Sequence, residues 1–450
     1  MLSCSSKRRQ LSWTAIAVIS IALVASCSYR IWASWQIRKE LAKLEASGEP
    51  TDFGQLDKLY PDVPSSENAA LLYSQAFARI NHDANERFKE LMDSIEAMDD
   101  DTPLSSSNKA AISIELRKHA PALQLLHNAT KLKQARYPIS FRKGPNTDVE
   151  HLSGVEVSVR VLALEALLAA EQGDAAAAIR SLRAILALGA SISREPQLRS
   201  HAYRFFCNHT AFYLVPRVLH KAKPSASGLA DLQDYFHLAS QPVDLGPAFR
   251  AERCFRLRLN EKAYLRLMFD TDRESRVSVE ILSPVLTALG RYEGDQLFYL
   301  ENIHPFIQAS SKPFDERIRL IGEQSDRLYR RGKRQLYFVS TLLFIDYEPY
   351  VRGDIESAAR LRVALTTLAV ERFRRDNNGD LPASLDHVVT RYLKEPPVDP
   401  FDDKGIKFSD RSTHYAVYSL GRDRVDNRGR RLRRGENATR PHDLVLQVKK

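Results

Sequence analysis

Residues 159–192 of this 450-residue chain read VRVLALEALLAAEQGDAAAAIRSLRAILALGASI, and this stretch decides the fold class. Apolar residues recur at three- and four-residue spacing on both sides of Gly173-Asp174, as in two amphipathic helices. Gly173 suits the left-handed residue that ends one helix, and Asp174 suits the N-cap of the next. The stretch therefore predicts an antiparallel helix pair.

Helical patterns continue through most of the chain, and strand patterns are sparse before the C-terminus. The helix pair resembles one tetratricopeptide unit, but we find no second copy at a fixed period and interpret it as a generic hairpin. The apolar share of 44% and the charged share of 27% are those of a folded protein. We therefore predict a mainly α fold whose multi-helix body of antiparallel hairpins covers residues 36–350.

The N-terminus has the pattern of a membrane anchor. Three basic residues, Lys7 to Arg9, precede the uncharged segment Leu11 to Tyr29, whose length is close to the ~20 residues that span a bilayer. Trp32 and Trp35 follow where interfacial aromatic residues are expected. Residues 1–35 are thus predicted to form a signal anchor or signal peptide with a transmembrane helix. The basic flank predicts a single-pass protein of the cell inner membrane with its bulk in the periplasm.

Two other interpretations of this segment stay open. Val24 to Cys27 resembles a permissive lipobox, in which Cys27 would be lipidated after cleavage, and ordinary signal cleavage is the third alternative. All three export the body. In the exported part, Cys207 and Cys254 could pair in an oxidising compartment, but we expect buried free thiols.

The charge of the chain is basic, with a formal net charge of +10. Such a balance is typical of proteins that meet nucleic acid, anionic lipid or an acidic polymer. Because the body is predicted to be exported, we expect no nucleic-acid partner. The expected partners are the membrane, through the N-terminal helix, and a protein of the envelope.

The C-terminal part has a distinct order of elements. A long helix, DIESAARLRVALTTLAVERFRRD, is predicted to begin at Gly353-Asp354, with one apolar face and one arginine-rich face. Asn378-Gly379 then ends the helix, and Asp399-Pro400-Phe401 follows a Pro-Pro pair. Residues 406–408 are predicted to pair with residues 415–418, and residues 443–448 could add a strand.

This order, VERFRRDNNGDLPASLDHVV, YLKEPPVDPFDDKGIKF and HYAVYSLGRD, resembles the C-terminal part of the major pseudopilin of type II secretion. The resemblance covers residues 354–446. It implies a small α+β module with a short antiparallel sheet, here residues 351–450, and a link to type II secretion-like machinery. The pilin processing site is missing from the N-terminus, so polymerisation into a pseudopilus is not implied.

The resemblance also implies a calcium site, because the final loop of that family often binds calcium. The corresponding oxygen-bearing residues here are Ser419, Asp423, Asp426, Asn427 and Asp443. Calcium takes about six to eight oxygen ligands, and the arginine-rich run RGRRLRRGE lies among these residues. A weak calcium site and a solvated polar loop are therefore the two interpretations. No other cofactor is expected.

The N-terminal part of the body resembles that of uncharacterised bacterial membrane-anchored envelope proteins, through Gly48-Glu49-Pro50 and residues 60–70. We identify no catalytic or cofactor-binding residues, because the common metalloprotease, nucleophile-elbow and phosphate-loop motifs are missing. His201 and His209, on either side of Cys207, are at most a weak metal candidate. The sequence favours a non-enzymatic, membrane-anchored scaffold or interaction protein. The alternative is an envelope hydrolase or transferase with an unrecognised acid/base site.

Overall fold

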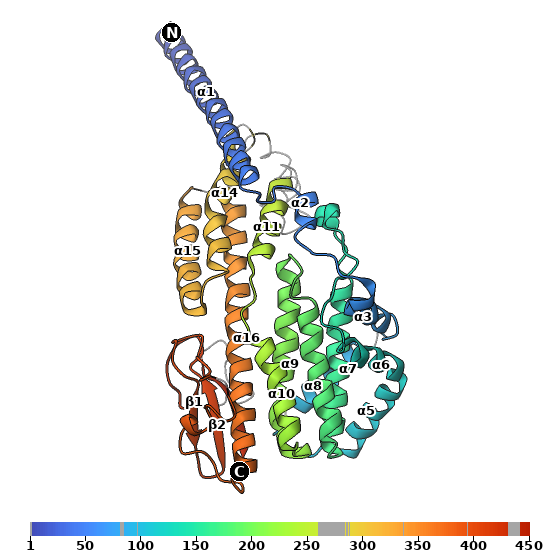
Figure 1. The fold of residues 1–450 in the computed structure, drawn as a ribbon. Coiled ribbons are helices and arrows are strands. Elements are labelled where there is room, and N and C mark those ends of the chain that lie inside the picture. The colour runs from blue at the N-terminus through green and yellow to red at the C-terminus, as the bar shows by residue number, and fades with distance from the viewer. Residues whose placement is uncertain are drawn as a thin grey trace.

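The computed structural model describes residues 2–81, 85–96, 98–259, 284, 287, 289–335, 337–393, 395–430 and 442–450. The protein is 66% helical and 6% strand, so the predicted mainly α fold is confirmed. Figure 1 shows a helical body from which one long helix projects at the N-terminal end and to which a small sheet is attached near the C-terminus.

The projecting helix is α1 (Leu2–Ala46), which runs without interruption from the apolar segment into the body. Residues 16–46 are long and apolar enough to cross a membrane, and only 6% of the most apolar window is buried. The helix ends in a tight turn in which the Glu49 amide donates to the Leu44 carbonyl at 2.9 Å. A signal sequence near the N-terminus has the same length and apolar composition.

The body consists of helices. Their bounds are α2 (Phe53–Asp57), α3 (Ala69–Phe77), α4 (Asn85–Glu96), α5 (Ser106–Lys118), α6 (Ala120–Ala129), α7 (His151–Glu171), α8 (Ala175–Ser191), α9 (Leu198–Ala222), α10 (Ala226–Ala239), α11 (Gly246–Arg258), α14 (Arg291–Ala309), α15 (Phe314–Gln335) and α16 (Phe338–Asp376). Within the described residues, short 3₁₀ turns cover Ser65–Glu67, Phe141–Asn146 and Leu385–His387.

The hairpin predicted at residues 159–192 is confirmed as α7 and α8. Gly173 has a φ of 75°, and the Asp174 carboxylate accepts a hydrogen bond from the Ala177 amide at 2.9 Å. Alanine and leucine side chains fill the contact between these helices and α9. We call this part the aliphatic core; its fully buried members include Leu162, Ala166, Leu182, Ile185 and Val215.

A second core lies among α11, α14, α15 and the first half of α16. It is rich in rings, and we call it the aromatic core. Phe344 stacks on Tyr299 and Phe306 with ring centroids 5.2 and 5.3 Å apart. The hydroxyls of Tyr299 and Tyr347 are hydrogen-bonded at 2.7 Å, so the buried polar ends of these rings are satisfied.

The predicted start of the C-terminal helix at Gly353-Asp354 is wrong, because α16 begins at Phe338 and continues through Pro349 and Gly353. At Gly353 an added Cβ would lie 2.8 Å from Cδ2 of Phe205 on α9. This glycine therefore allows two helices to approach closely and does not begin the helix. The predicted module boundary at residue 351 consequently lies inside one continuous helix.

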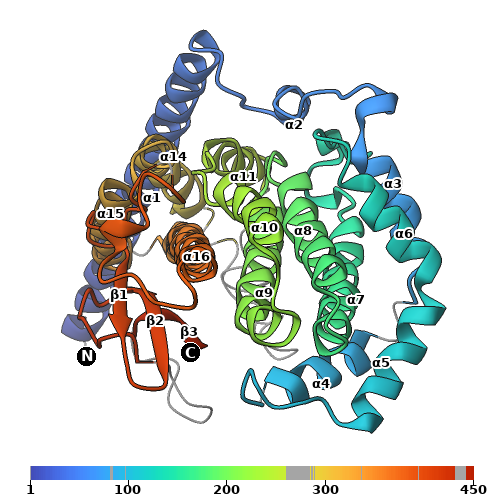
Figure 2. The same ribbon diagram turned by 60° about the horizontal axis from the view of Figure 1, so that its bottom comes forward.

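The C-terminal sheet has the order β1-β2-β3, with β1 (Lys407–Asp410), β2 (His414–Ser419) and β3 (Leu444–Lys449) all antiparallel to their neighbours. Phe408 pairs with Val417, as the predicted strand pairing requires. Figure 2 shows α16 between this sheet and helices α9 and α10. The hydroxyl of Tyr415 donates to Glu371 Oε1 at 2.6 Å and joins β2 to α16.

Candidate functional site

The junction between α1 and α14 is the first candidate site, because it connects the apolar helix to the body. Ala33 and Ile37 of α1 are buried against Leu297 and Leu300 of α14. The contacts advance along both helices in the same direction, so α1 and α14 run parallel. The end of α14 that carries Arg291 therefore faces the apolar segment.

Polar contacts fix the junction at the point where the apolar segment ends. Arg30 Nη2 lies 2.7 Å from Glu293 Oε1, and the hydroxyls of Tyr29 and Tyr337 are 3.1 Å apart. A Cβ at Gly294 would lie 2.5 Å from the Tyr29 hydroxyl oxygen. The close approach of the two helices thus requires a glycine at this position.

A second contact fixes the chain where it leaves α1. The Glu49 carboxylate accepts hydrogen bonds from Arg250 Nε at 2.9 Å and from Arg253 Nη2 at 2.8 Å. Burial acts to raise the pKa of Glu49, but the hydrogen bonds from the two arginines outweigh it and hold the pKa below its ordinary value. Arg253 is fully buried and also donates to the Pro50 carbonyl at 3.0 Å. Gly48-Glu49-Pro50 therefore joins α1 to α11.

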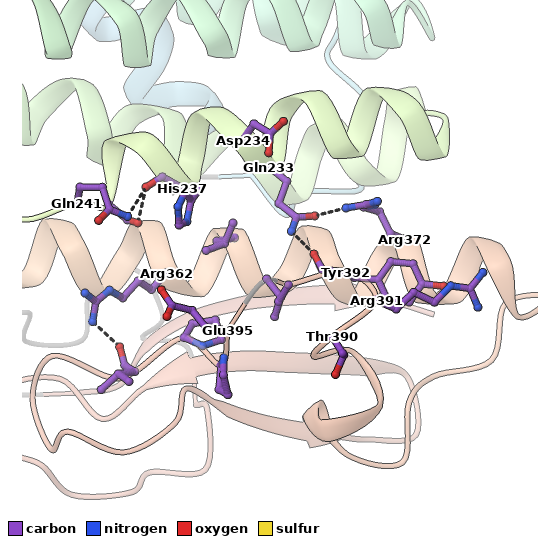
Figure 3. Close-up of a pocket in the computed structure, with 16 residues that line it drawn as sticks. Gln233, Asp234, His237, Gln241, Arg362, Arg372, Thr390, Arg391, Tyr392 and Glu395 are labelled. Atoms are coloured by element: carbon purple, nitrogen blue, oxygen red, sulfur yellow. Dashed lines mark hydrogen bonds between the residues drawn. The ribbon is translucent and has the colours of Figure 1, made fainter.

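The second candidate site is an open pocket of about 390 Å³ between α10, α16 and the Pro-Pro loop. Figure 3 shows Gln233 of α10 between the Arg372 guanidinium and the backbone of Tyr392. Arg372 Nη1 donates to Gln233 Oε1 at 3.0 Å, and Arg362 Nη1 donates to the Val398 carbonyl at 2.7 Å. The pocket therefore lies where the helical body meets the C-terminal residues.

The charged groups of this pocket are distributed unevenly. Arg362 and Arg372 are half-buried, whereas Asp234 and Glu395 are exposed. Burial lowers the pKa of Arg362, and the charges of Asp399, Glu395 and Asp403 act in the opposite direction. A pocket of this size with guanidinium groups in its wall can receive a small group that carries negative charge.

One wall of the pocket has an unusual backbone. Thr390 has a φ of 79°, which is rare for a β-branched residue. Its amide donates to the Leu393 carbonyl at 3.0 Å, which closes a turn within the loop. Backbone strain of this kind gathers at functional sites.

The residues proposed for calcium lie at the end of the sheet, and they bond mainly to the protein backbone. The buried Asp443 carboxylate accepts the amides of Asn427 at 3.3 Å and Gly429 at 2.7 Å, and burial raises its pKa. Ser419 donates to Asp399 Oδ1 at 2.8 Å. The Asp423 and Asp426 carboxylates accept the amides of the residues two positions ahead, Val425 and Arg428.

Calcium binding stays a prediction, and residues 431–436 of the arginine-rich run lie outside the described residues. Within the described part of the chain, no group of three or more His, Cys, Asp or Glu side chains is arranged to hold a metal ion. A calcium site would raise the thermal midpoint in calcium relative to chelator; a solvated polar loop would leave it unchanged. Differential scanning fluorimetry measures this shift.

The cysteines and histidines singled out by their spacing are placed as follows. Cys27 is exposed on α1, whereas Cys207 and Cys254 are buried free thiols, as expected. Burial raises the pKa of both buried thiols to about 12 and lowers the pKa of His201 to about 3. Groups this far from titration at neutral pH behave as packing residues.

No protein-family model, curated protein or solved structure matches this chain. The resemblance to pseudopilins therefore stays a prediction. Sequence reasoning missed the pocket, although it noted the arginine-rich face of the helix on which Arg362 and Arg372 lie. It also missed Glu49 as the partner of Arg253, since the two residues are far apart in the chain.

Proposed function

We propose that this protein is a non-enzymatic envelope protein that α1 holds in the cell inner membrane, with its bulk in the periplasm. In this proposal the helical body and a pseudopilin-like C-terminal module face a protein partner. The observation that carries the proposal is the continuity of α1 from the apolar segment into a fixed contact with α14. Such a helix sets the position of the body relative to the membrane, whereas a flexible linker would leave the body free to move.

The pocket between α10, α16 and the Pro-Pro loop is the proposed partner site. The pocket lies between the body and the C-terminal residues. The guanidinium groups of Arg362 and Arg372 suit an acidic side chain or a terminal carboxylate of the partner. A link to type II secretion-like machinery is part of this proposal, through the resemblance of residues 354–446.

Site-specific crosslinking in native membranes tests the partner proposal. A photoactivatable amino acid at the exposed Glu395 of the pocket is compared with the same residue at the exposed Lys89 of α4, on another part of the surface. We expect a discrete protein adduct from position 395 and none from position 89. Secretion components in that adduct would support the link, and no adduct from position 395 would overturn the partner site.

The state of the N-terminus is tested separately. A periplasmic reporter fused after Lys450 is expected to be active, and the intact mass of the membrane-extracted protein is expected to match the uncleaved chain. A diacylglyceryl adduct on a chain that begins at Cys27 would replace the anchor with the lipoprotein alternative. A shortened chain in the soluble fraction would overturn membrane anchoring.

A further inference from the structure

The last turns of α15 carry a dense group of arginines. Arg327, Arg330, Arg331 and Arg334 are all exposed, and we call them the α15 basic end. Among the described residues, no carboxylate lies within salt-bridge distance of Arg327, Arg330 or Arg334. By contrast, Arg319 near the other end of the helix pairs with Glu323 at 3.4 Å.

Along the axis of α1, the α15 basic end lies level with the residues at which the apolar segment ends. Because α1 and α14 are parallel and α15 returns beside α14, the C-terminus of α15 points toward the apolar part of α1 (Figure 1). Tyr337, two residues after α15, contacts Tyr29 at 3.1 Å. The Arg331 guanidinium lies 5.4 Å from the ring of Phe298, about one helical turn from Gly294.

Two exposed aromatic residues of α1 follow directly after the end of the apolar segment. Trp32 and Trp35 are 47% and 53% exposed, although they are large apolar side chains. Tryptophans of this kind are typical of the membrane–water interface, where their rings lie at the headgroups. The α15 basic end thus points toward the part of α1 that carries this exposed aromatic pair.

Ordinary helix chemistry accounts for only part of this group. The helix dipole favours cations within the last turn, which explains Arg334. It does not explain Arg327 and Arg330, which lie earlier in the helix and have no ion-pair partner in the described part of the chain. A surface with this charge fits phosphate groups.

We propose that the α15 basic end binds the headgroups of anionic phospholipids in the leaflet from which α1 emerges, so that the body lies against the bilayer. This inference rests on the proposed anchoring by α1, which brings the arginines to the membrane at high effective concentration. Each arginine near an anionic surface strengthens attachment about fivefold, and the effect decreases with salt.

The test uses the full-length protein in nanodiscs of phosphatidylcholine with and without phosphatidylglycerol. Native mass spectrometry counts the phosphatidylglycerol molecules that stay bound on release. The variant R330Q/R334Q is compared with R319Q/R375Q, which removes the same charge from an exposed pair farther from Tyr29. We expect phosphatidylglycerol retention to fall about tenfold or more in R330Q/R334Q, with little change in the control.

Equal retention in the two variants, or no preference for phosphatidylglycerol in the native sequence, would overturn this inference while the anchor stands. An acidic protein that binds the native sequence but not R330Q/R334Q, without lipid preference, would overturn the lipid assignment. If the chain cannot be recovered in nanodiscs because residues 1–26 are removed, the proposed anchoring itself fails. Matching thermal midpoints of both variants show that the comparison concerns folded protein.

Discussion

The two halves of α16 are buried by different chemistry. Up to Ala359 the helix packs in the aromatic core, where rings stack and charged groups are buried among them. From Leu361 onward it packs in the aliphatic core, against leucine, valine and alanine. One helix thus belongs to two interiors, and the change occurs within a single turn.

The two halves of α16 therefore depend on different contacts. In the aliphatic core, stability depends on how well the side-chain volumes fill the interior, and neighbouring apolar residues can partly compensate for each other. Beside the aromatic core, the buried Asp354 accepts hydrogen bonds from Arg204 of α9 and from Arg317 of α15, the latter at 2.6 Å. If only this carboxylate is removed, both guanidinium groups stay buried and lose the acceptor to which they are hydrogen-bonded, which is strongly destabilising.

The largest effect is expected from breaking this charged group. The variant Asp354→Asn leaves Arg204 and Arg317 buried without their counter-charge, and we expect the free energy of unfolding to fall by about 3–5 kcal/mol. Denaturant titration of the detergent-solubilised protein measures this loss. Glu323→Gln makes the same chemical change in an exposed pair with Arg319 and should cost about 1 kcal/mol or less. Similar losses in the two variants would contradict the contrast.

A cavity created by mutation in the aliphatic core tests the other half of this comparison. Leu162 is fully buried in α7, and Leu162→Ala is expected to cost about 2–5 kcal/mol, depending on how far the neighbouring side chains collapse. Leu71→Ala on α3, where the leucine is 40% exposed, is the control, with an expected change of about 0.5 kcal/mol. A negligible loss for Leu162→Ala would mean that this core is not closely packed.

The third prediction concerns pH at the place where the two cores meet. His201 of α9 is buried and lies in the chain between Leu198 of the aromatic core and Cys207 of the aliphatic core. Burial, with a smaller contribution from Arg204, lowers its pKa to about 3. Unfolding restores an ordinary pKa of about 6.5, so the unfolded chain takes up the proton first as pH falls. Stability is therefore retained above pH ~6.5 and decreases below it, by about 2 kcal/mol at pH ~5.

Thermal midpoints measured from pH ~7 to ~5 test this for the native sequence and for His201→Asn. We expect the variant to lose less stability over that interval, whereas His304→Asn, at an exposed histidine, should behave like the native sequence. Equal pH dependence in all three proteins would show that His201 is not the group that titrates.

The smallest effect is expected at the α1–α14 junction. The Arg30 and Glu293 side chains are 36% and 13% exposed, so Glu293→Gln should cost about 0.2–1 kcal/mol. Chemical denaturation in low and high salt measures the change, since salt screens an exposed pair more than a buried one. A loss as large as that of Asp354→Asn would place this pair with the buried charges.

Prediction from the sequence succeeded where the signals are local and failed where they depend on a tertiary contact. The α7–α8 hairpin could be predicted because its signals, Gly173-Asp174 and the apolar spacing, lie next to each other in the chain. The pairing of Phe408 with Val417 could be predicted for a similar reason. The predicted start of α16 is wrong because Gly353-Asp354 resembles a helix start, and only the contact with Phe205 explains the glycine.

The candidate sites depended on pairs that are distant in the chain. The arginine-rich face of the C-terminal helix was visible, but the loop at Thr390 that completes the pocket with α10 was not. The partner of Arg253 was missed because Glu49 lies 204 residues before Arg253 in the chain.

The sequence by itself determined the mainly α fold, the apolar N-terminal helix, the short C-terminal sheet and the buried thiols, since each depends on local periodicity or composition. Only the tertiary structure decided that α1 runs parallel to α14, that Asp354 lies between two arginines, and that the α15 basic end lies at the height of Tyr29. These arrangements depend on contacts between distant segments, and such contacts leave no periodic pattern in the sequence.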